Sequence, residues 1–514
     1  MKRPVSPVSP VNPVSPDEPR ATLRFAEKRE LILDGAARLF NRRGIKAGTL
    51  AEVAASVGLA TNSLTYYYRK KEDLVCACLL RSIHALDGLV ADAASADTLA
   101  QRVQVLVHAF IGLMADVAER RRPALIFFGD MRALPQPQAA PVFDAYVAMW
   151  RGLRRLLREA APGADGSLFQ AHDDARAGAH TDSHTDPHTD PHTDFHTGAN
   201  TDTNTRRGLN ARTHLLLSQL LWSRAWLTRF EPADFPRVAV ALCDVLLNGL
   251  AAPGQRWAPH TAAAAAPLAP GVVPAVVSAV VPAAVANVVP AAVVSAVPAA
   301  MPEPEADKLA DAYLRTATRL INDHGVGGAS VERIAATLAL TKGSFYHHHD
   351  TKHGLVDACF ERSFALIRRV QLAALSQPGN GWQRLLAATL PLVALHDDPN
   401  HNGAGPLLRL TAWTELPDAL RWRKWQTLNR LGERYAAMIT AGMIDGSVRM
   451  VDPAVAAQMV CGLVNALGEA GHWVSPGGDA TLGQLLARPL LCGLLADVEH
   501  RPDVYFDPAP APAA

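Results

Sequence analysis

Apolar residues recur at spacings of three and four along most of the chain, which is the pattern of helices that bury one face. Runs that alternate apolar and polar residues between turn signals, as strands do, are missing outside one proline-rich segment. The pattern therefore predicts an all-α protein. Its longest predicted helices cover residues 72–93, 97–119, 209–229, 235–251, 354–375, 416–444 and 454–472.

Low-complexity segments interrupt these helices. Residues 1–19 have a proline at every third position and no apolar core, so they predict a disordered arm and not a signal peptide. Residues 252–306 are rich in Ala, Val and Pro. Because any window long enough to span a bilayer contains several prolines there, the segment is predicted to be a linker and not a membrane helix. Residues 501–514 are predicted to be a disordered tail.

A His-Thr-Asp repeat lies within an insertion at about residues 165–207. Its histidines recur every four residues, which would align them on one helix face, but Pro187 and Pro191 prevent that helix. We therefore predict a surface-loop expansion and no metal site. The six cysteines are scattered and form neither a disulfide framework nor a zinc pattern, which is typical of a reducing, cytoplasmic compartment.

Comparison of the chain with itself shows an ungapped internal repeat. Residues 32–75 align with residues 313–356 at an offset of 281. The identical positions include Ala36 with Ala317, Leu39 with Leu320, Gly44 with Gly325 and Ser63 with Ser344. The chain therefore carries the same unit twice, and we call these units copy one and copy two.

Each copy predicts three helices joined by short turns. The first helix is expected to stop at Gly44 or Gly325, because a glycine suits the C-terminal cap of a helix. Thr49 then opens a short helix with Glu52 three residues on, which is a capping box, and Ser330 takes the same N-cap position in copy two. A third helix follows within three or four residues, so each copy is predicted to be a helix-turn-helix.

The second helix of each motif, residues 60–67 or 341–348, is the one that enters the major groove of DNA. Hydroxyl groups, Tyr and Lys suit phosphate oxygens, and Asn and His can read base edges, whereas Leu64 and Phe345 are expected to face the core. To these residues of the second helix we add the N-cap residue of the first helix of the motif and the lysine that opens the next helix. The candidate DNA-binding residues of copy one are Thr49, Thr61, Asn62, Ser63, Tyr66, Tyr67 and Lys71. Those of copy two are Ser330, Thr341, Lys342, Gly343, Ser344, Tyr346, His347, His348 and Lys352.

Both copies resemble the DNA-binding domain of the tetracycline-repressor (TetR) family of bacterial transcription regulators. Copy two, with LTKGSFYHHHDTKHGL, resembles it more closely. The resemblance assigns the family's phosphate-contacting lysine to Lys342, its tyrosine to Tyr346 and the lysine that opens helix four to Lys352. In copy one, Thr61 and Thr65 stand in place of the first two.

The resemblance also implies that a helical ligand-binding and dimerisation domain follows each DNA-binding domain. The predicted layout is DNA-binding domain 1 at 20–71, regulatory domain 1 at 72–251, the linker at 252–306, DNA-binding domain 2 at 307–353 and regulatory domain 2 at 354–500. The family's dimer-interface helices correspond to residues 211–229 with 234–251, and 453–473 with 479–497. Because both halves carry them, we expect an intrachain pseudo-dimer or a homodimer.

The resemblance implies a sequence-specific DNA-binding regulator, a repressor released from its double-stranded operator by a small-molecule effector. It implies no catalytic residue, no cofactor and no membrane partner. The residues that bind the effector cannot be assigned from the sequence. Trp382, Trp413, Trp422 and His396 are candidates for lining a pocket, although core packing is the commoner role of buried tryptophans.

The two copies differ in their local net charge, although the whole chain carries a net charge of only +1. Residues 20–71 carry a net +7, and residues 308–352 a net +2. We therefore expect copy one to supply general attraction to phosphates and copy two to supply more of the base readout.

Two alternative interpretations remain open. In the first, one half has lost DNA binding and acts as a sensor or dimerisation module, because copy one lacks the lysine and tyrosine of copy two. In the second, the chain is an all-α enzyme or metal-binding protein that uses the histidines of copy two. No catalytic motif supports that interpretation. In addition, His347, His348 and His349 would point about 100° apart on a helix and cannot converge on one ion.

Overall fold

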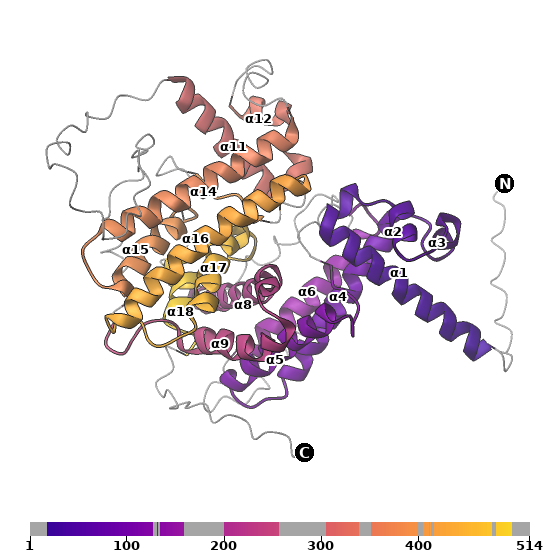
Figure 1. The fold of residues 1–514 in the computed structure, drawn as a ribbon, viewed down its shortest axis with the longest axis horizontal. Coiled ribbons are helices and arrows are strands. Elements are labelled where there is room, and N and C mark those ends of the chain that lie inside the picture. The colour runs from indigo at the N-terminus through magenta and orange to yellow at the C-terminus, as the bar shows by residue number, and fades with distance from the viewer. Residues whose placement is uncertain are drawn as a thin grey trace, which may run out of the picture. The chain divides into compact units, whose positions relative to one another are not determined.

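The computed structural model describes residues 18–126, 131, 134–158, 200–255, 257, 305–338, 351–397, 405–410, 412, 416–474 and 480–495. Within these ranges every regular element is a helix, and the one isolated β-bridge joins Ala251 to Val448 (Figure 1). The predicted all-α class is confirmed. Most of the predicted arm, insertion and linker, and the whole tail, lie outside the described residues.

The predicted helices agree with the structure to within a few residues at nearly every end. The main difference is the helix predicted at residues 209–229, which begins earlier, at Asn200, inside the predicted insertion, and ends at Trp226. The helix predicted over 479–497 is shorter in the structure, because it consists of a π-helical turn at Gly483–Ala487 and an α-helical turn at Arg488–Leu491.

The chain divides into two compact units. Unit 1 comprises residues 1–85 and 116–145, and unit 2 comprises residues 86–115 and 146–514. Unit 1 therefore contains DNA-binding domain 1. Unit 2 contains DNA-binding domain 2 and helices of both predicted regulatory domains.

Unit 1 is built around the first helix of copy one. Its elements are α1 (Glu18–Ala47), α2 (Leu50–Ser56), α3 (Thr61–Tyr67) and the first part of α4 (Lys71–Ala93). The predicted apolar stripe of α1 is buried, with Ile32 and Ala36 fully inaccessible. Gly44 has a φ of 77°, a left-handed value that favours glycine, so the regular helix breaks where predicted although helical turns continue to Ala47.

Unit 2 is a larger bundle that combines helices of both halves of the chain (Figure 1). The first half supplies most of α5 (Leu99–Ala118) and α6 (Ala139–Leu156), together with α8 (Asn200–Trp226) and α9 (Phe235–Asn248). The second half supplies α11 (Glu305–Gly328), α12 (Val331–Thr337), α14 (Lys352–Ser376), α15 (Gly381–Ala394), α16 (Asp418–Ile444), α17 (Pro453–Trp473), η7 (Gly483–Ala487) and α18 (Arg488–Leu491).

The two halves meet where α8 packs on α17. Three buried side chains of α8 bond to main-chain carbonyls of α17: Gln219 Nε2 to Met459 at 3.0 Å, Trp222 Nε1 to Gln458 at 2.9 Å and His214 Nε2 to Ala466 at 2.9 Å. The helices approach closely because α17 has a glycine, Gly462, facing Gln219 and Trp222. Buried donors that find backbone acceptors across a contact fix the register of the two helices.

The ends of these helices join the halves a second time. α9 packs on α17 and α18, and the Leu494 N–H donates to the Leu246 carbonyl at 2.8 Å. Arg449 Nη1 forms an ion pair with Asp244 at 2.9 Å, and its Nε donates to the Gly249 carbonyl at 2.6 Å. The helices predicted as dimer-interface helices of the two halves thus pack on one another within one chain.

Two described helices, α4 and α17, are long and apolar enough to cross a bilayer by length and composition alone. In the apolar window of α17, 72% of the helix is buried within the protein, as in the core helix of a bundle.

Candidate DNA interface and effector cavity

The recognition helix of copy one, α3, is held by a tight turn after α2. The predicted capping box is present at the start of α2, where the Glu52 N–H donates to Thr49 Oγ1 at 3.2 Å and the Thr49 N–H donates to the Glu52 carboxylate at 3.0 Å. These bonds with Thr49 hold the pKa of Glu52 below its usual value. The chain then turns through Gly58, which has a φ of 69°, and α3 starts at Thr61.

One face of α3 is buried and the other faces solvent. Leu64 is fully inaccessible and Tyr68, at the helix end, is 6% exposed, so both belong to the core. Tyr66 is 77% exposed, and Thr61, Asn62 and Ser63 are exposed as well. The predicted polar residues therefore form a continuous outer surface on α3.

The remaining candidates of copy one lie near this surface or partly under it. Tyr67 is half-buried, because the ring of Phe25 from α1 stacks on it with 4.7 Å between ring centroids. Thr49 is exposed, but its hydroxyl is engaged in the capping box. Lys71 is the first residue of α4 and is partly exposed.

In copy two the described residues cover only the edges of the predicted interface. Ser330 caps α12 as predicted, since its Oγ accepts the Arg333 N–H at 3.2 Å. Lys352 is exposed and is the first residue of α14, directly after the N-cap Thr351. The other candidates lie outside the described residues: Thr341, Lys342, Gly343, Ser344, Tyr346, His347 and His348.

A repeated set of polar side chains ties each DNA-binding domain to a later segment of its half, which follows α5 in copy one and α15 in copy two. We call this set the polar clamp; it comprises Asn41, Arg81 and Ser82 in copy one, and Asn322, Arg362 and Ser363 in copy two. Members of the two sets occupy equivalent positions at the offset of 281. Sequence reasoning missed them, although their identity across the repeat was a usable signal.

The polar clamp makes the same contacts in both copies. In copy one, Asn41 Nδ2 donates to the Leu125 carbonyl at 2.7 Å, and Ser82 Oγ accepts the Ile126 N–H at 2.9 Å. In copy two, Asn322 Nδ2 donates to the Leu407 carbonyl at 2.8 Å and Ser363 Oγ accepts the next amide at 2.9 Å. The first helix of each DNA-binding domain is therefore bonded to an extended segment of its regulatory domain.

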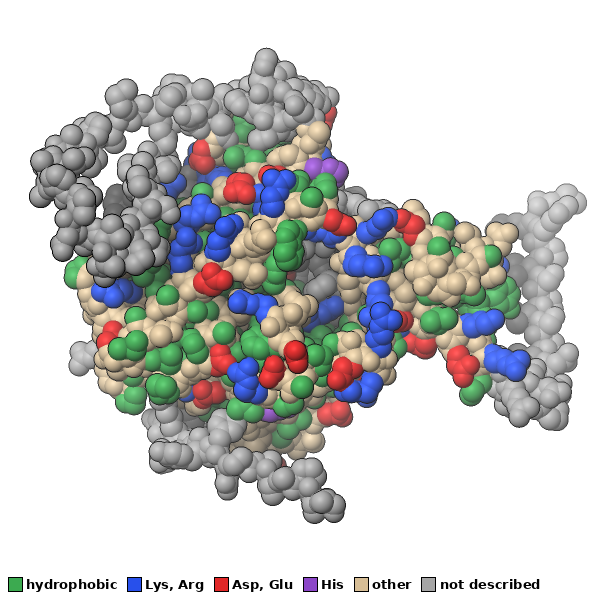
Figure 2. Space-filling view, in the orientation of Figure 1, with side chains coloured by type: hydrophobic (Ala, Val, Ile, Leu, Met, Phe, Trp, Pro, Cys, Tyr) green, Lys and Arg blue, Asp and Glu red, His purple; other side chains and the backbone are tan. Residues whose placement is uncertain are grey.

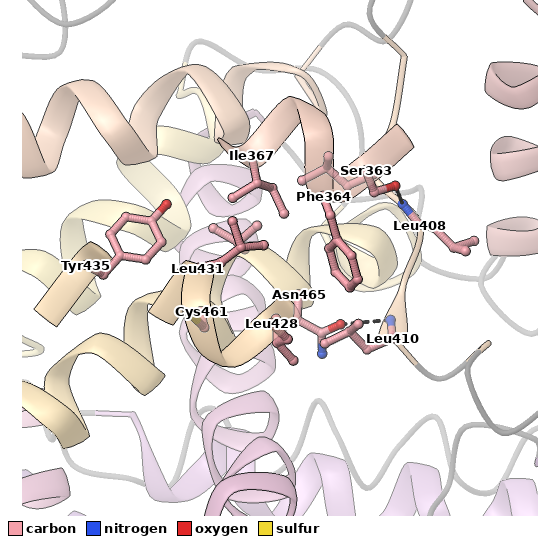
Figure 3. Close-up of a pocket in the computed structure, with 12 residues that line it drawn as sticks. Ser363, Phe364, Ile367, Leu408, Leu410, Leu428, Leu431, Tyr435, Cys461 and Asn465 are labelled. Atoms are coloured by element: carbon pink, nitrogen blue, oxygen red, sulfur yellow. Dashed lines mark hydrogen bonds between the residues drawn. The ribbon is translucent and has the colours of Figure 1, made fainter. Parts of the chain in front are cut away.

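In copy two that segment, residues 405–410, is also one wall of an apolar cavity (Figure 3). We call it the wall segment. The cavity has a volume of about 30 Å³, room for one or two water molecules. Its lining comprises Ser363, Phe364 and Ile367 of α14, Leu407, Leu408 and Leu410 of the wall segment, Leu428, Leu431 and Tyr435 of α16, and Cys461, Val464 and Asn465 of α17.

Three polar side chains of this lining, Ser363, Asn465 and Tyr435, are bonded to main-chain groups of the protein. Asn465 Oδ1 accepts the Leu410 N–H at 3.0 Å, and the Tyr435 hydroxyl donates to the Ala388 carbonyl at 3.1 Å. Burial raises the pKa of the Cys461 thiol to about 12, so this side chain is neutral. The lining carries no charged side chain, which favours an uncharged and mostly apolar occupant.

The tryptophans and histidine considered from the sequence do not line this cavity. Trp422 is 62% exposed, so it belongs to the surface of α16. Trp382 is buried and His396 is half-buried elsewhere, and burial of its ring lowers the pKa of His396 to about 4. Trp413 lies outside the described residues. Periodicity alone could not distinguish these positions, because apolar side chains that line a cavity follow the same pattern as those that fill a core.

Comparison with known proteins links both copies to one family. The family described as "Bacterial regulatory proteins, tetR family" matches residues 32–78 and again residues 314–359. The curated relatives include the HTH-type transcriptional regulator TtgR of Pseudomonas putida, 28% identical over 141 residues, which cover 26% of this chain and 67% of the relative. They also include AcrR of Shigella flexneri, 25% identical over 150 residues, 27% of this chain and 68% of the relative.

Similar solved structures include AibR in complex with isovaleryl coenzyme A and operator DNA, at 25% identity and a TM-score of 0.29, covering 35% of this chain and 94% of that one. PfmR of Thermus thermophilus is 21% identical with a TM-score of 0.29, over 35% of this chain and 98% of that one. Since the family model matches the repeat twice, and the curated relatives are transcriptional regulators, the chain carries two tandem domains that match the tetR family of bacterial regulatory proteins.

Proposed function

We propose that the chain is a cytoplasmic transcriptional repressor that works as a single-chain pseudo-dimer and binds one operator through two different helix-turn-helix domains. The observation that carries the proposal is the packing of α8 and α9 on α17 and α18. The family resemblance assigns these helices to a dimer interface, and here both sides of the contact belong to one chain. When both sides of a dimer-like interface lie in one chain, less apolar surface stays exposed to bind a second copy.

The two reading surfaces differ, so the operator is expected to be asymmetric. Copy one presents Thr61, Asn62 and Tyr66, whereas the same positions of copy two hold Lys342, Gly343 and His347. Two half-sites about 34–36 Å apart, one turn of DNA, suit the spacing of paired recognition helices. Selection of bound duplexes from a random pool, at a stated salt concentration, tests both DNA binding and asymmetry.

Replacing Tyr66 by alanine is expected to weaken binding to the selected operator about tenfold or more. A hydrogen bond to a charged phosphate contributes roughly 1.5–3 kcal/mol, and Tyr66 is exposed enough to make one. Fluorescence anisotropy with a labelled duplex measures the change. Trp422→Ala, which removes a similarly exposed aromatic ring from α16, is the control and should leave the affinity unchanged.

The Tyr66 variant also decides the second candidate function, in which the first half is a sensor or dimerisation module that does not bind DNA. That candidate is favoured by Thr61 and Thr65, which replace a lysine and a tyrosine, and by Ala60, which provides no side-chain cap for α3. If Tyr66→Ala binds the operator as tightly as the wild type, the second candidate is correct and the two-domain proposal is not.

We further propose that a small, uncharged and mostly apolar effector enters the cavity of the second half and relieves repression. The cavity is too small for such a molecule in the form described, so the effector has to displace part of the lining. The wall segment is mostly non-helical, with a 3-10 turn at its end at Leu410, and it is bonded to Asn322 of α11. Its displacement would therefore shift the equilibrium orientation of DNA-binding domain 2.

A further inference from the structure

The N-terminal part of α1 extends beyond the core of unit 1. Residues 23–31 are all exposed, and Ile32, which follows them, is buried. Nine residues of α-helix are about 13 Å long. This stretch, which we call the α1 extension, nevertheless carries large apolar side chains, with Leu23 63% exposed and Phe25 43% exposed.

The α1 extension is fixed against the recognition helix of copy one. The Phe25 ring stacks on Tyr67 at 4.7 Å between centroids, with 26° between the ring planes, and meets Tyr66 edge-on at 6.3 Å. One turn further on, Arg29 Nε donates to the Tyr68 hydroxyl at 3.0 Å. Three consecutive residues at the end of α3 thus contact the extension, so a duplex that lies against α3 also lies beside it.

Charge on the α1 extension is divided between two sides. Arg24 and Lys28 are exposed, lie one turn apart, and are within about 100° of Phe25 around the helix axis. Glu27 and Glu30 lie about 140–160° from Phe25, and Glu30 pairs with Arg81 at 3.1 Å. Figure 2 shows Lys and Arg side chains at this exposed end of α1. Two like charges one turn apart repel each other in the free protein, and a bound anion removes that cost.

The two copies carry their basic and aromatic residues on different helices. Copy one lacks the lysine and the tyrosine that copy two has at Lys342 and Tyr346. At the offset of 281, Arg24, Phe25 and Lys28 correspond to Glu305, Ala306 and Leu309, so copy two lacks the basic and aromatic residues of the extension. Copy one lacks one basic residue on α3 and carries two, Arg24 and Lys28, on the helix that packs against it.

We propose that the α1 extension is a second DNA-contacting element of copy one. Arg24 and Lys28 bind phosphates beside the groove that α3 enters, and Phe25 holds them there by stacking on Tyr67. The proposal rests on the proposed function, because its partner is double-stranded DNA. The surface is continuous with the exposed face of α3, and its charge is complementary to the phosphate backbone.

The test is the salt dependence of binding by the full-length chain to a fluorescein-labelled duplex selected from a random pool. Each phosphate contact contributes about 0.9 to the slope of log K against log salt. Arg24→Gln/Lys28→Gln is therefore expected to lower the slope by about 1.8. Phe25→Ala should lower it similarly, and Phe25→Trp should restore it, since a tryptophan also stacks on Tyr67.

Arg151→Gln/Arg155→Gln is the matched control, because it removes two exposed arginines one turn apart on α6 and should leave the slope unchanged. If the wild type binds and the Arg24/Lys28 variant keeps the wild-type slope, the extension does not contact DNA and the inference is wrong. In that case the basic side of the α1 extension would suit an acidic protein partner instead of DNA. If the wild-type chain selects no duplex at all, the proposed function itself fails.

Discussion

Replacing Gly462 by alanine is expected to destabilise unit 2 by about 1–3 kcal/mol, the usual cost of overpacking a core. The new Cβ would lie 2.7 Å from Trp222 Cδ1 and 2.8 Å from Gln219 Oε1. Both side chains are buried and bonded to carbonyls of α17, so neither can move aside without losing its bond. Since the contact of α8 with α17 holds the two halves together, operator affinity should fall at least tenfold.

Gly471→Ala is the matched control for this prediction. Gly471 lies in the same helix, and a Cβ added there meets no atom within 4 Å. Alanine is the better helix former, so this variant should be as stable as the wild type or more stable by up to about 1 kcal/mol. Urea unfolding and anisotropy measure the two effects. Equal behaviour of the two variants would show that the close approach of α8 and α17 does not hold the halves together.

Replacing Asn322 by alanine is expected to abolish most of the response to the effector. The change leaves the Leu407 carbonyl and the Arg409 amide without the partner that joins them to α11. Removing this partner from two buried groups costs about 2–6 kcal/mol of stability. In the variant, a displaced wall segment no longer pulls on α11. In the wild type we expect the effector to lower operator affinity by the typical factor of about 5–150. In the variant it should lower operator affinity less than about threefold.

Asn41→Ala distinguishes this loss of coupling from a loss of stability. Asn41 makes the equivalent bond in copy one, at 2.7 Å to the Leu125 carbonyl. Its replacement should also destabilise its unit but leave the response to an effector bound in the second half unchanged. An Asn322→Ala variant with a wild-type effector response would rule out the wall segment as the link between cavity and DNA-binding domain.

Much of the fold follows from local signals in the sequence. Apolar periodicity predicted the long helices, and the capping box of Thr49 and Glu52 located the start of α2. The repeat at an offset of 281 predicted two related halves of the chain, and the family resemblance indicated which helices join the halves. These features depend on residues close together in sequence, or on a pattern that occurs twice, so a single sequence was sufficient.

The cavity and the polar clamp could not be predicted, because both depend on contacts between distant residues. Asn322 resembles any polar residue on a helix until its partners at Leu407 and Arg409 are known. Trp422 fits the apolar pattern of α16 but is 62% exposed. The contact of Phe25 with Tyr67 was equally hidden, since the sequence did not show that α1 includes the exposed residues 23–31.

The mass of the complex between the full-length chain and its selected operator tests the central claim most directly. Native mass spectrometry of the protein with a duplex obtained by random-pool selection gives the number of chains bound. A single-chain pseudo-dimer predicts one chain on a duplex whose two half-sites differ in sequence. Two chains on a palindromic duplex would contradict it, because each chain would then contribute only one of its two DNA-binding domains to the operator.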